Sequence, residues 1–90
     1  MPIPDFQTPM RPILEILADG AKHATREIID QIAVRFDLTP EERTQQLPSG
    51  RALLLNNRIG WALSHMKHAG LIESPRRAVY AITERGRAVL

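Results

Sequence analysis

Two groups of side chains in the second half of the sequence have residue types suited to binding a polyanion. The segment NNRIGWALSHMKHAG contains Asn57, Arg58 and Trp61, and the pair Arg76 and Arg77 follows shortly after it. In the major groove of DNA, an Asn amide can bond bidentately to adenine and an Arg guanidinium to guanine, while arginines also contact phosphates. These residue types therefore predict contacts to double-stranded DNA.

The predicted DNA-contacting set takes in the polar side chains around both groups: Arg51, Asn57, Arg58, Trp61, Ser64, His65, Lys67, His68, Arg76 and Arg77. The charge distribution agrees with such a surface. Residues 1–47 carry five basic and eight acidic side chains, a net charge of −3, whereas residues 48–90 carry seven basic and two acidic ones, a net charge of +5. This asymmetry indicates a side that faces a polyanion, and the alternative is a solvated basic surface without a partner.

The residue types and their spacing give little indication of a catalytic site or a metal site. The chain has no Cys, which excludes disulfides, thiolate zinc sites and thiol nucleophiles. Nucleases of the PD-(D/E)xK kind need a lysine two residues after an acidic ligand, and neither Lys22 nor Lys67 has this spacing. His65 and His68 could share a metal with His23, but no carboxylate joins them, so ordinary surface histidines are the favoured interpretation. We expect no enzymatic activity and no cofactor in this chain.

Three main helices are predicted from the spacing of apolar residues. The first ends near Ala18, and the second begins with Thr25 as its N-cap. The third begins at Leu53 or Asn56 and closes at Gly70. Between the second and third, Thr39-Pro40-Glu41-Glu42 has the pattern of a capping box and predicts a short helical turn.

A β-hairpin is predicted after the third helix. The short runs LIES and AVYAI are β-prone, with Pro75-Arg76-Arg77 as the turn between them. Thr83 is expected to cap a last helical turn in which Gly86 is a weak point. This order predicts an α+β fold of the winged helix-turn-helix kind, with three main helices and a C-terminal β-hairpin wing, in a single domain over residues 1–90.

The single Trp lies on an unexpected side of the third helix. Leu55, Ile59, Ala62, Met66 and Ala69 form its core stripe, whereas Asn57, Trp61, Ser64 and His68 fall on the opposite side. On a DNA-facing surface the indole could pack on the methyl group of thymine or of a modified base. Alternatively, Trp61 packs against the N-terminal PIPDF segment or a second protomer, and Asn57 caps the helix. Gly60 indicates close approach by another helix or by a nucleic acid backbone.

The segment NRIGWALSHMKHAGLIESPRRAVYAIT resembles the N-terminal domain of Mrr-type restriction endonucleases. The pattern of that family runs Asn-Arg-Val-Gly-Trp-Ala, then Ala-Gly-Leu, Ser-Pro-Arg-Arg and Ile-Thr, and PMRPIL and LPSGR extend the match over nearly the whole chain. The resemblance implies that the domain precedes a nuclease domain in a longer protein and helps to recognise modified DNA. It implies this role for Asn57, Arg58, Trp61, Arg76 and Arg77.

The expected function is therefore binding of double-stranded DNA, with recognition of methylated or otherwise modified bases for a restriction system. One alternative is a winged-helix transcription regulator that binds a palindrome as a homodimer, and another is a winged helix used only for protein interaction. The N-terminal sequence has no signal-peptide pattern and no apolar run approaches a membrane span, which predicts a cytoplasmic protein with no membrane partner.

Overall fold

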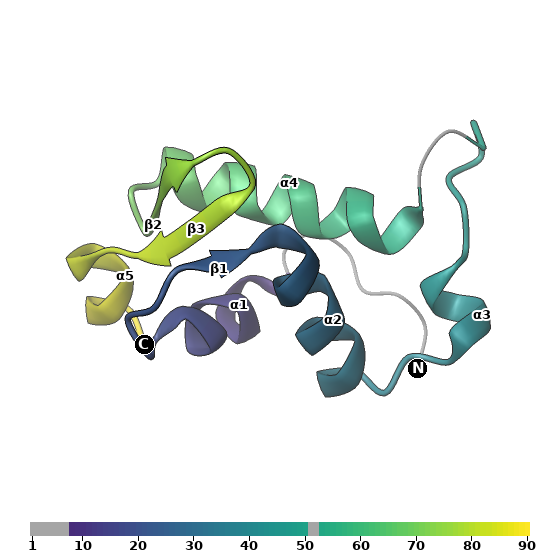
Figure 1. Cartoon of the computed structure of the whole chain (residues 1–90), viewed down its shortest axis with the longest axis horizontal. Coiled ribbons are helices and arrows are strands. Elements are labelled where there is room, and N and C mark those ends of the chain that lie inside the picture. Colours follow the sequence, from purple (N-terminus) through teal and green to yellow (C-terminus); the bar gives the residue numbers. More distant parts are fainter. Residues whose placement is uncertain (1–7, 51–52) are drawn as a thin grey trace.

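The computed structural model describes residues 8–50 and 53–90 and has the α+β winged-helix arrangement (Figure 1). Three main helices and a C-terminal hairpin are present, as predicted, together with two short helices and a further short strand. In chain order the elements are α1 (Met10–Leu17), β1 (His23–Ala24), α2 (Thr25–Arg35), α3 (Pro40–Arg43), α4 (Leu54–His68), β2 (Ile72–Arg76), β3 (Val79–Ile82) and α5 (Glu84–Ala88).

The sheet has three antiparallel strands in the order β1-β3-β2, with β3 in the middle. Strand β1 pairs His23 with Tyr80 and Ala24 with Val79, so a short strand that the sequence did not predict lies between α1 and α2. Two residues are too few to show an alternating pattern, because periodicity needs at least four positions to become visible. The added strand ties the start of α2 to the hairpin.

The hairpin turn lies two residues later than expected. Pro75 and Arg76 belong to β2, and the turn consists of Arg77 and Ala78, with Ala78 in the left-handed region at φ 61°. Strand β2 is an edge strand whose register shifts between Glu73 and Arg76. Proline is tolerated at such places because an edge or a bulge does not require its missing N–H.

The helix caps follow the sequence at two places and depart from it at a third. The capping box of Thr39 and Glu42 is confirmed, and the Thr83 hydroxyl accepts from the N–H of Gly86, as predicted. Thr25, however, is the first residue of α2 rather than its N-cap, which is Ala24. The backbone N–H of Thr25 donates to the Ala78 carbonyl at 2.9 Å, so the hairpin turn takes the place of a side-chain cap.

Gly86 is not a weak point in α5, because the fold requires a residue without a side chain there. It is buried, and a Cβ atom at this position would lie 2.1 Å from the carbonyl oxygen of Leu71 and 2.8 Å from Cγ1 of Ile82. The glycine therefore allows α5 to pack directly against the backbone at the start of the hairpin.

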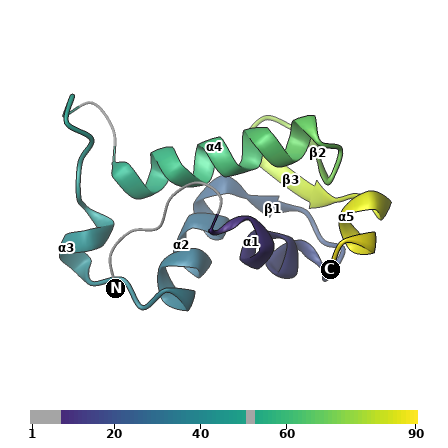
Figure 2. The same cartoon turned by 180° about the vertical axis from the view of Figure 1, so that it is seen from behind.

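The core lies between α1, α2, α4 and the sheet, and the apolar stripe of α4 faces it (Figures 1 and 2). Its buried residues are Ile13, Leu14, Ile16, Leu17, Ile28, Ile32, Ala33, Leu55, Ile59, Ala62, Leu63, Met66, Ile72 and Ile82. Within residues 8–50 and 53–90, no helix is long and apolar enough to cross a membrane. Because α4 buries one face in this core, its opposite face is left on the surface.

Candidate functional site

The outward face of α4 carries the polar residues that the sequence placed there. Trp61 is 54% exposed, Ser64 and His68 are exposed, and Asn57 is half-buried. On the other side, the predicted core residues Leu55, Ile59, Ala62 and Met66 are buried, whereas Ala69 is exposed because it is the C-cap that ends the helix. In this chain Trp61 is therefore a surface residue and not part of the core. The PIPDF segment, against which Trp61 could have packed, lies outside the described residues.

Asn57 is not a helix cap. The N-cap of α4 is Leu53, and the backbone N–H of Asn57 donates to the Leu53 carbonyl at 3.0 Å as part of the helix. Within the described parts of the chain, the Asn57 side chain makes no hydrogen bond. Its amide group is therefore available to a ligand from inside the first half of the helix, where helix-turn-helix proteins contact bases.

A shallow hollow of about 320 Å³ lies on this face of α4, lined by Asn57, Gly60, Trp61 and Ser64. Gly60 is exposed, and among the described residues only its chain neighbours and the backbone of its own helix lie within 4 Å of the position that a Cβ atom would occupy there. The expected close approach of another helix to Gly60 is therefore not found among the residues that the structure describes. The glycine instead leaves the backbone of α4 accessible from outside.

Two histidines border the hollow on its C-terminal side. The ring of His65 lies beside that of Trp61, with 6.0 Å between the centroids and a tilt of 37°. Nδ1 of His68 lies 2.9 Å from the carbonyl oxygen of Ser64. These contacts restrict both rings from within the helix and leave the exposed part of the indole facing outward.

Positive side chains flank the same face. Arg58 is half-buried and Lys67 is exposed, and neither makes an ion pair or a side-chain hydrogen bond within residues 8–50 and 53–90. Arg51, which the sequence added to this set, lies outside the described residues. The flanks of α4 thus present cations that have no carboxylate partner in the part of the chain that the structure describes.

The hairpin places Arg76 and Arg77 at its tip, with both side chains exposed. The hydroxyl oxygen of Ser74 lies 2.8 Å from the Arg76 carbonyl and 2.9 Å from the Val79 carbonyl, which closes the bulge next to the turn. Strand β2 packs against α4. The two groups of residues singled out by the sequence therefore lie on neighbouring elements, although no hydrogen bond joins them in the described structure.

Other arginines of the basic half have structural roles that the sequence did not reveal. The Arg85 guanidinium donates to the Ala69 carbonyl at 3.1 Å, and that of Arg87 donates to the Ala18 carbonyl at 3.2 Å. These carbonyls belong to the C-terminal caps of α4 and α1, where a cation also interacts favourably with the helix dipole. Not all of the net charge of +5 is therefore available to a polyanion.

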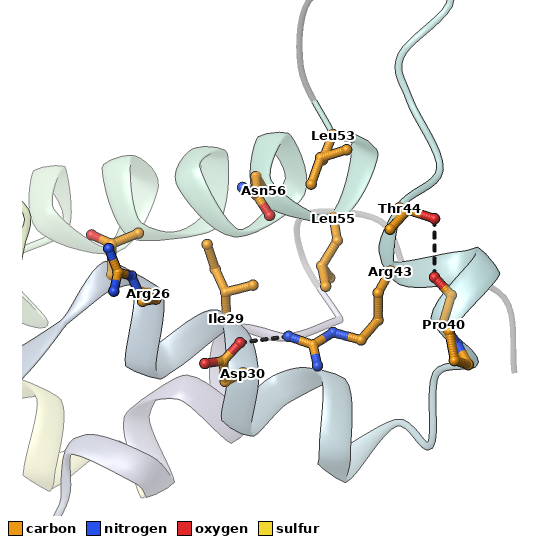
Figure 3. Close-up of a pocket in the computed structure, with 10 residues that line it drawn as sticks. Arg26, Ile29, Asp30, Pro40, Arg43, Thr44, Leu53, Leu55 and Asn56 are labelled. Atoms are coloured by element: carbon orange, nitrogen blue, oxygen red, sulfur yellow. Dashed lines mark hydrogen bonds and ion pairs between the residues drawn. The ribbon is translucent and has the colours of Figure 1, made fainter.

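A cavity of about 630 Å³ lies between α2, α3 and the start of α4 (Figure 3). An ion pair of 2.5 Å between Arg43 and Asp30 ties α3 to α2 across it. Arg26 and Asn56 also line the cavity and were not singled out by the sequence. Arg26 has no ion-pair partner in the described ranges, so it adds a cation in the first turn of α2. Its position directly after the start of that helix was the only signal that could have drawn attention to it.

The three histidines do not come together. His23 lies in β1 with its ring between Asp19 and Glu27, whereas His65 and His68 lie on α4. The hydrogen bond from His23, together with one from the Ala21 N–H, lowers the pKa of the Asp19 carboxyl. Within the described residues, no group of three or more His, Asp or Glu side chains is placed to hold a metal ion.

The family model of the Mrr N-terminal domain matches residues 6–90. The chain is 33% identical over 89 residues to the type IV methyl-directed restriction enzyme EcoKMrr of Escherichia coli (strain K12). This alignment covers 96% of the chain but only 28% of the relative, so the chain spans a little over a quarter of that protein. No solved structure gives a significant match.

Proposed function

Because the chain belongs to the Mrr N-terminal domain family, we propose that it binds double-stranded DNA as part of a restriction system. Residues 1–90 act as one domain and have no enzymatic activity of their own. In the longer protein, a nuclease domain supplies the chemistry, and the domain described here selects the DNA. Its place of action is the cytoplasm, without a membrane partner.

The observation that carries this proposal is the distribution of unpaired cations around the outward face of α4. Arg58, Lys67, Arg76 and Arg77 lack carboxylate partners in the described structure, whereas Arg35 pairs with Glu15 on the opposite, acidic half of the chain. A polyanion is attracted to the first group and gains little from a cation that is already neutralised. An α-helix of this size fits the major groove of B-DNA.

The finer part of the proposal concerns modified bases. The relative is named a methyl-directed enzyme, and the α4 face offers an exposed indole beside an unpaired amide. An apolar ring can pack on a base methyl group, which a hydrogen-bonding side chain does not detect. Trp61 therefore reads a methyl group, and Asn57 reads the hydrogen-bonding edge of the same or a neighbouring base.

Arg76 and Arg77 hold a phosphate next to the contacted bases or enter the minor groove. The remaining members of the predicted set that the structure describes, Ser64, His65 and His68, complete the contact surface of α4, and Arg51 is a further proposed DNA contact.

A binding panel tests the proposal. Labelled duplexes that differ only in methylation are titrated with the protein, and affinity is followed by fluorescence anisotropy. We expect binding to all duplexes that weakens steeply with salt, and tighter binding to a methylated one. Binding only to an unmethylated palindrome, with two protomers per duplex, would favour a dimeric transcription regulator. No salt-dependent binding at all would favour a protein-interaction module.

Two substitutions test which feature of the DNA each side chain contacts. Trp61→Ala should abolish the preference for the methylated duplex and leave much of the phosphate-driven affinity, because base contacts specify and phosphate contacts position. Asn57→Ala should cost about 1–3 kcal/mol at a site containing adenine and little at random sequence. Thermal melts control for folding. Because Trp61 is a surface residue, its truncation should cost well below the roughly 3–5 kcal/mol typical of a core Trp. A larger loss of stability would show that the indole packs in the protein.

A further inference from the structure

Gly60 occupies a position in α4 that neither the backbone nor the packing of this chain explains. It lies inside a helix of 15 residues, between Leu54 and His68. Glycine is unfavourable inside a helix because it loses more conformational freedom on folding than any other residue. The usual reason for accepting this cost is a left-handed backbone, but Gly60 is not among the glycines with positive φ, which are Gly20, Gly50 and Gly70.

The other usual reason is a close contact within the protein, and that contact is also missing. Apart from its chain neighbours and the backbone of its own helix, no atom of the described residues would lie within 4 Å of a Cβ atom at position 60, whereas at Gly86 the Cβ atom would collide with the Leu71 carbonyl. The two glycines therefore differ in kind. Gly86 serves the fold, and Gly60 leaves open space on an exposed face of the molecule.

The open space has a particular surrounding. Gly60 forms part of the hollow of about 320 Å³ whose other walls are Asn57, Trp61 and Ser64. All four residues are uncharged, so the hollow offers an amide, a hydroxyl, an indole and bare backbone. A phosphate group would be drawn instead to the cations on the flanks, Arg58 and Lys67. A base edge, which combines hydrogen-bonding groups with apolar surface, suits the lining of the hollow.

We propose that Gly60 determines specificity for a methylated base by admitting the major-groove edge of that base into the hollow. This inference rests on the proposed function and deepens it. The gap at position 60 lets the methyl group reach the side of the Trp61 indole, while the Asn57 amide bonds the adjacent donor or acceptor. A methyl at C5 of cytosine and a methyl at N6 of adenine offer the same apolar group from different bases, and the duplexes tested distinguish them.

The test compares Gly60→Ala with the wild-type protein and a control variant on three otherwise identical duplexes, which carry 5-methylcytosine, N6-methyladenine or no modification. Because Ala is the better helix former and its methyl group meets open space, we expect Tm to rise by about 2–8 °C. The same methyl group fills the gap in the DNA interface. A preference for one methylated duplex of about fourfold, the factor for burying one methyl-sized group, should fall to nearly none.

Val34→Ala is the matched control, because Val34 is 77% exposed on α2 and lies outside the hollow. This variant also improves helix propensity at a surface position, and its methyl preference should equal that of the wild type. A gain in stability together with a loss of preference, seen only for Gly60→Ala, is not what a purely structural glycine would give.

Each other outcome overturns the inference in a recognisable way. If the wild-type protein binds no duplex, the proposed function and this inference fail together. If it prefers a methylated duplex and Gly60→Ala retains that preference, only the inference fails. If Gly60→Ala weakens binding to all duplexes equally, the gap admits the phosphate backbone and not a base edge. If Gly60→Ala lowers Tm, the space is already filled in the free protein.

Discussion

Removal of the two arginines at the hairpin tip should reduce the salt dependence of DNA binding by a calculable amount. Arg76 and Arg77 are exposed and have no ion-pair partner in the described structure, so each is able to neutralise one phosphate. Each phosphate contact contributes about 0.9 to the slope of log K against log salt concentration. The double variant Arg76→Ala/Arg77→Ala should therefore have a slope shallower by about 1.8. Between 50 and 200 mM salt, the wild-type protein should lose about 12-fold more affinity than the variant loses.

The assay is a series of equilibrium titrations by fluorescence anisotropy at four or more salt concentrations, with a methylated and an unmethylated duplex. Both duplexes should give the same change of slope, because phosphate contacts position the protein without reading sequence. The double variant Arg85→Ala/Arg87→Ala is the control with an equal loss of charge. Its guanidinium groups cap α4 and α1, so it should lower the Tm and change the slope by well under one unit.

Two results would refute this reasoning. An unchanged slope in Arg76→Ala/Arg77→Ala would remove the hairpin from the interface. Equal changes of slope in both double variants would show that only the net charge of the domain matters, and that the location of the cations on the hairpin has no influence.

Three further predictions concern the scaffold. Gly86→Ala should lower the free energy of unfolding by about 1–3 kcal/mol or more in urea titrations, because its Cβ atom would overlap the Leu71 carbonyl; a variant as stable as the wild type would contradict the packing of α5. Ala78→Gly should raise the same free energy by up to about 1 kcal/mol, because glycine accepts the left-handed backbone at φ 61° more easily; a less stable variant would show that the turn relaxes to another conformation. The hydrogen bond from the Thr39 backbone lowers the pKa of the Glu42 carboxyl, so this bond stabilises the fold above about pH 4.5 and the effect disappears as the pH falls through the lowered pKa. The variant Glu42→Gln should therefore lose less stability than the wild type between pH 5 and pH 3. Equal losses of stability would exclude this contribution.

The sequence predicted the main helices and their faces because local patterns determine them. The apolar stripe of α4 repeats at helical spacing, and the same periodicity predicts that Trp61 lies opposite this stripe. The periodicity left open whether the indole packs against another segment, and the structure shows that it is 54% exposed. The capping residues Thr39 and Thr83 were equally visible, since a cap depends on residues three positions apart.

Features that depend on distant parts of the chain were not predictable. Strand β1 exists because His23 and Ala24 meet β3, more than fifty residues later, and two residues carry no pattern. The N–H of Thr25 bonds to Ala78 for the same reason, which displaced the expected cap. The predicted turn position is wrong because proline favours turns and Pro75 was therefore expected in one. The structure places Pro75 in the edge strand, where the irregular register accommodates a residue without an N–H.

The sequence predicted the residue types of the candidate site but could not predict which of its cations remain without a partner in the fold. The net charge of the second half counts all of its arginines equally, although Arg85 and Arg87 donate hydrogen bonds to backbone carbonyls. Conversely, Arg26 belongs to the acidic half and was not predicted, although it lies in the first turn of α2 and lines the same cavity as Asn56. Which cations remain available depends on tertiary contacts, and these are absent from a count.

The separation of the two faces of α4 has a consequence for how DNA specificity can change. Leu55, Ile59 and Met66 hold the helix in the core, where the loss of a large side chain typically costs about 2–5 kcal/mol. Asn57, Gly60 and Trp61 lie on the outward face, away from the core, so substitutions there should change stability far less. Under the function that we propose, different side chains on that face would select different bases on the same scaffold. Two domains of this fold with different base preferences would then be expected to differ on the outward face of α4.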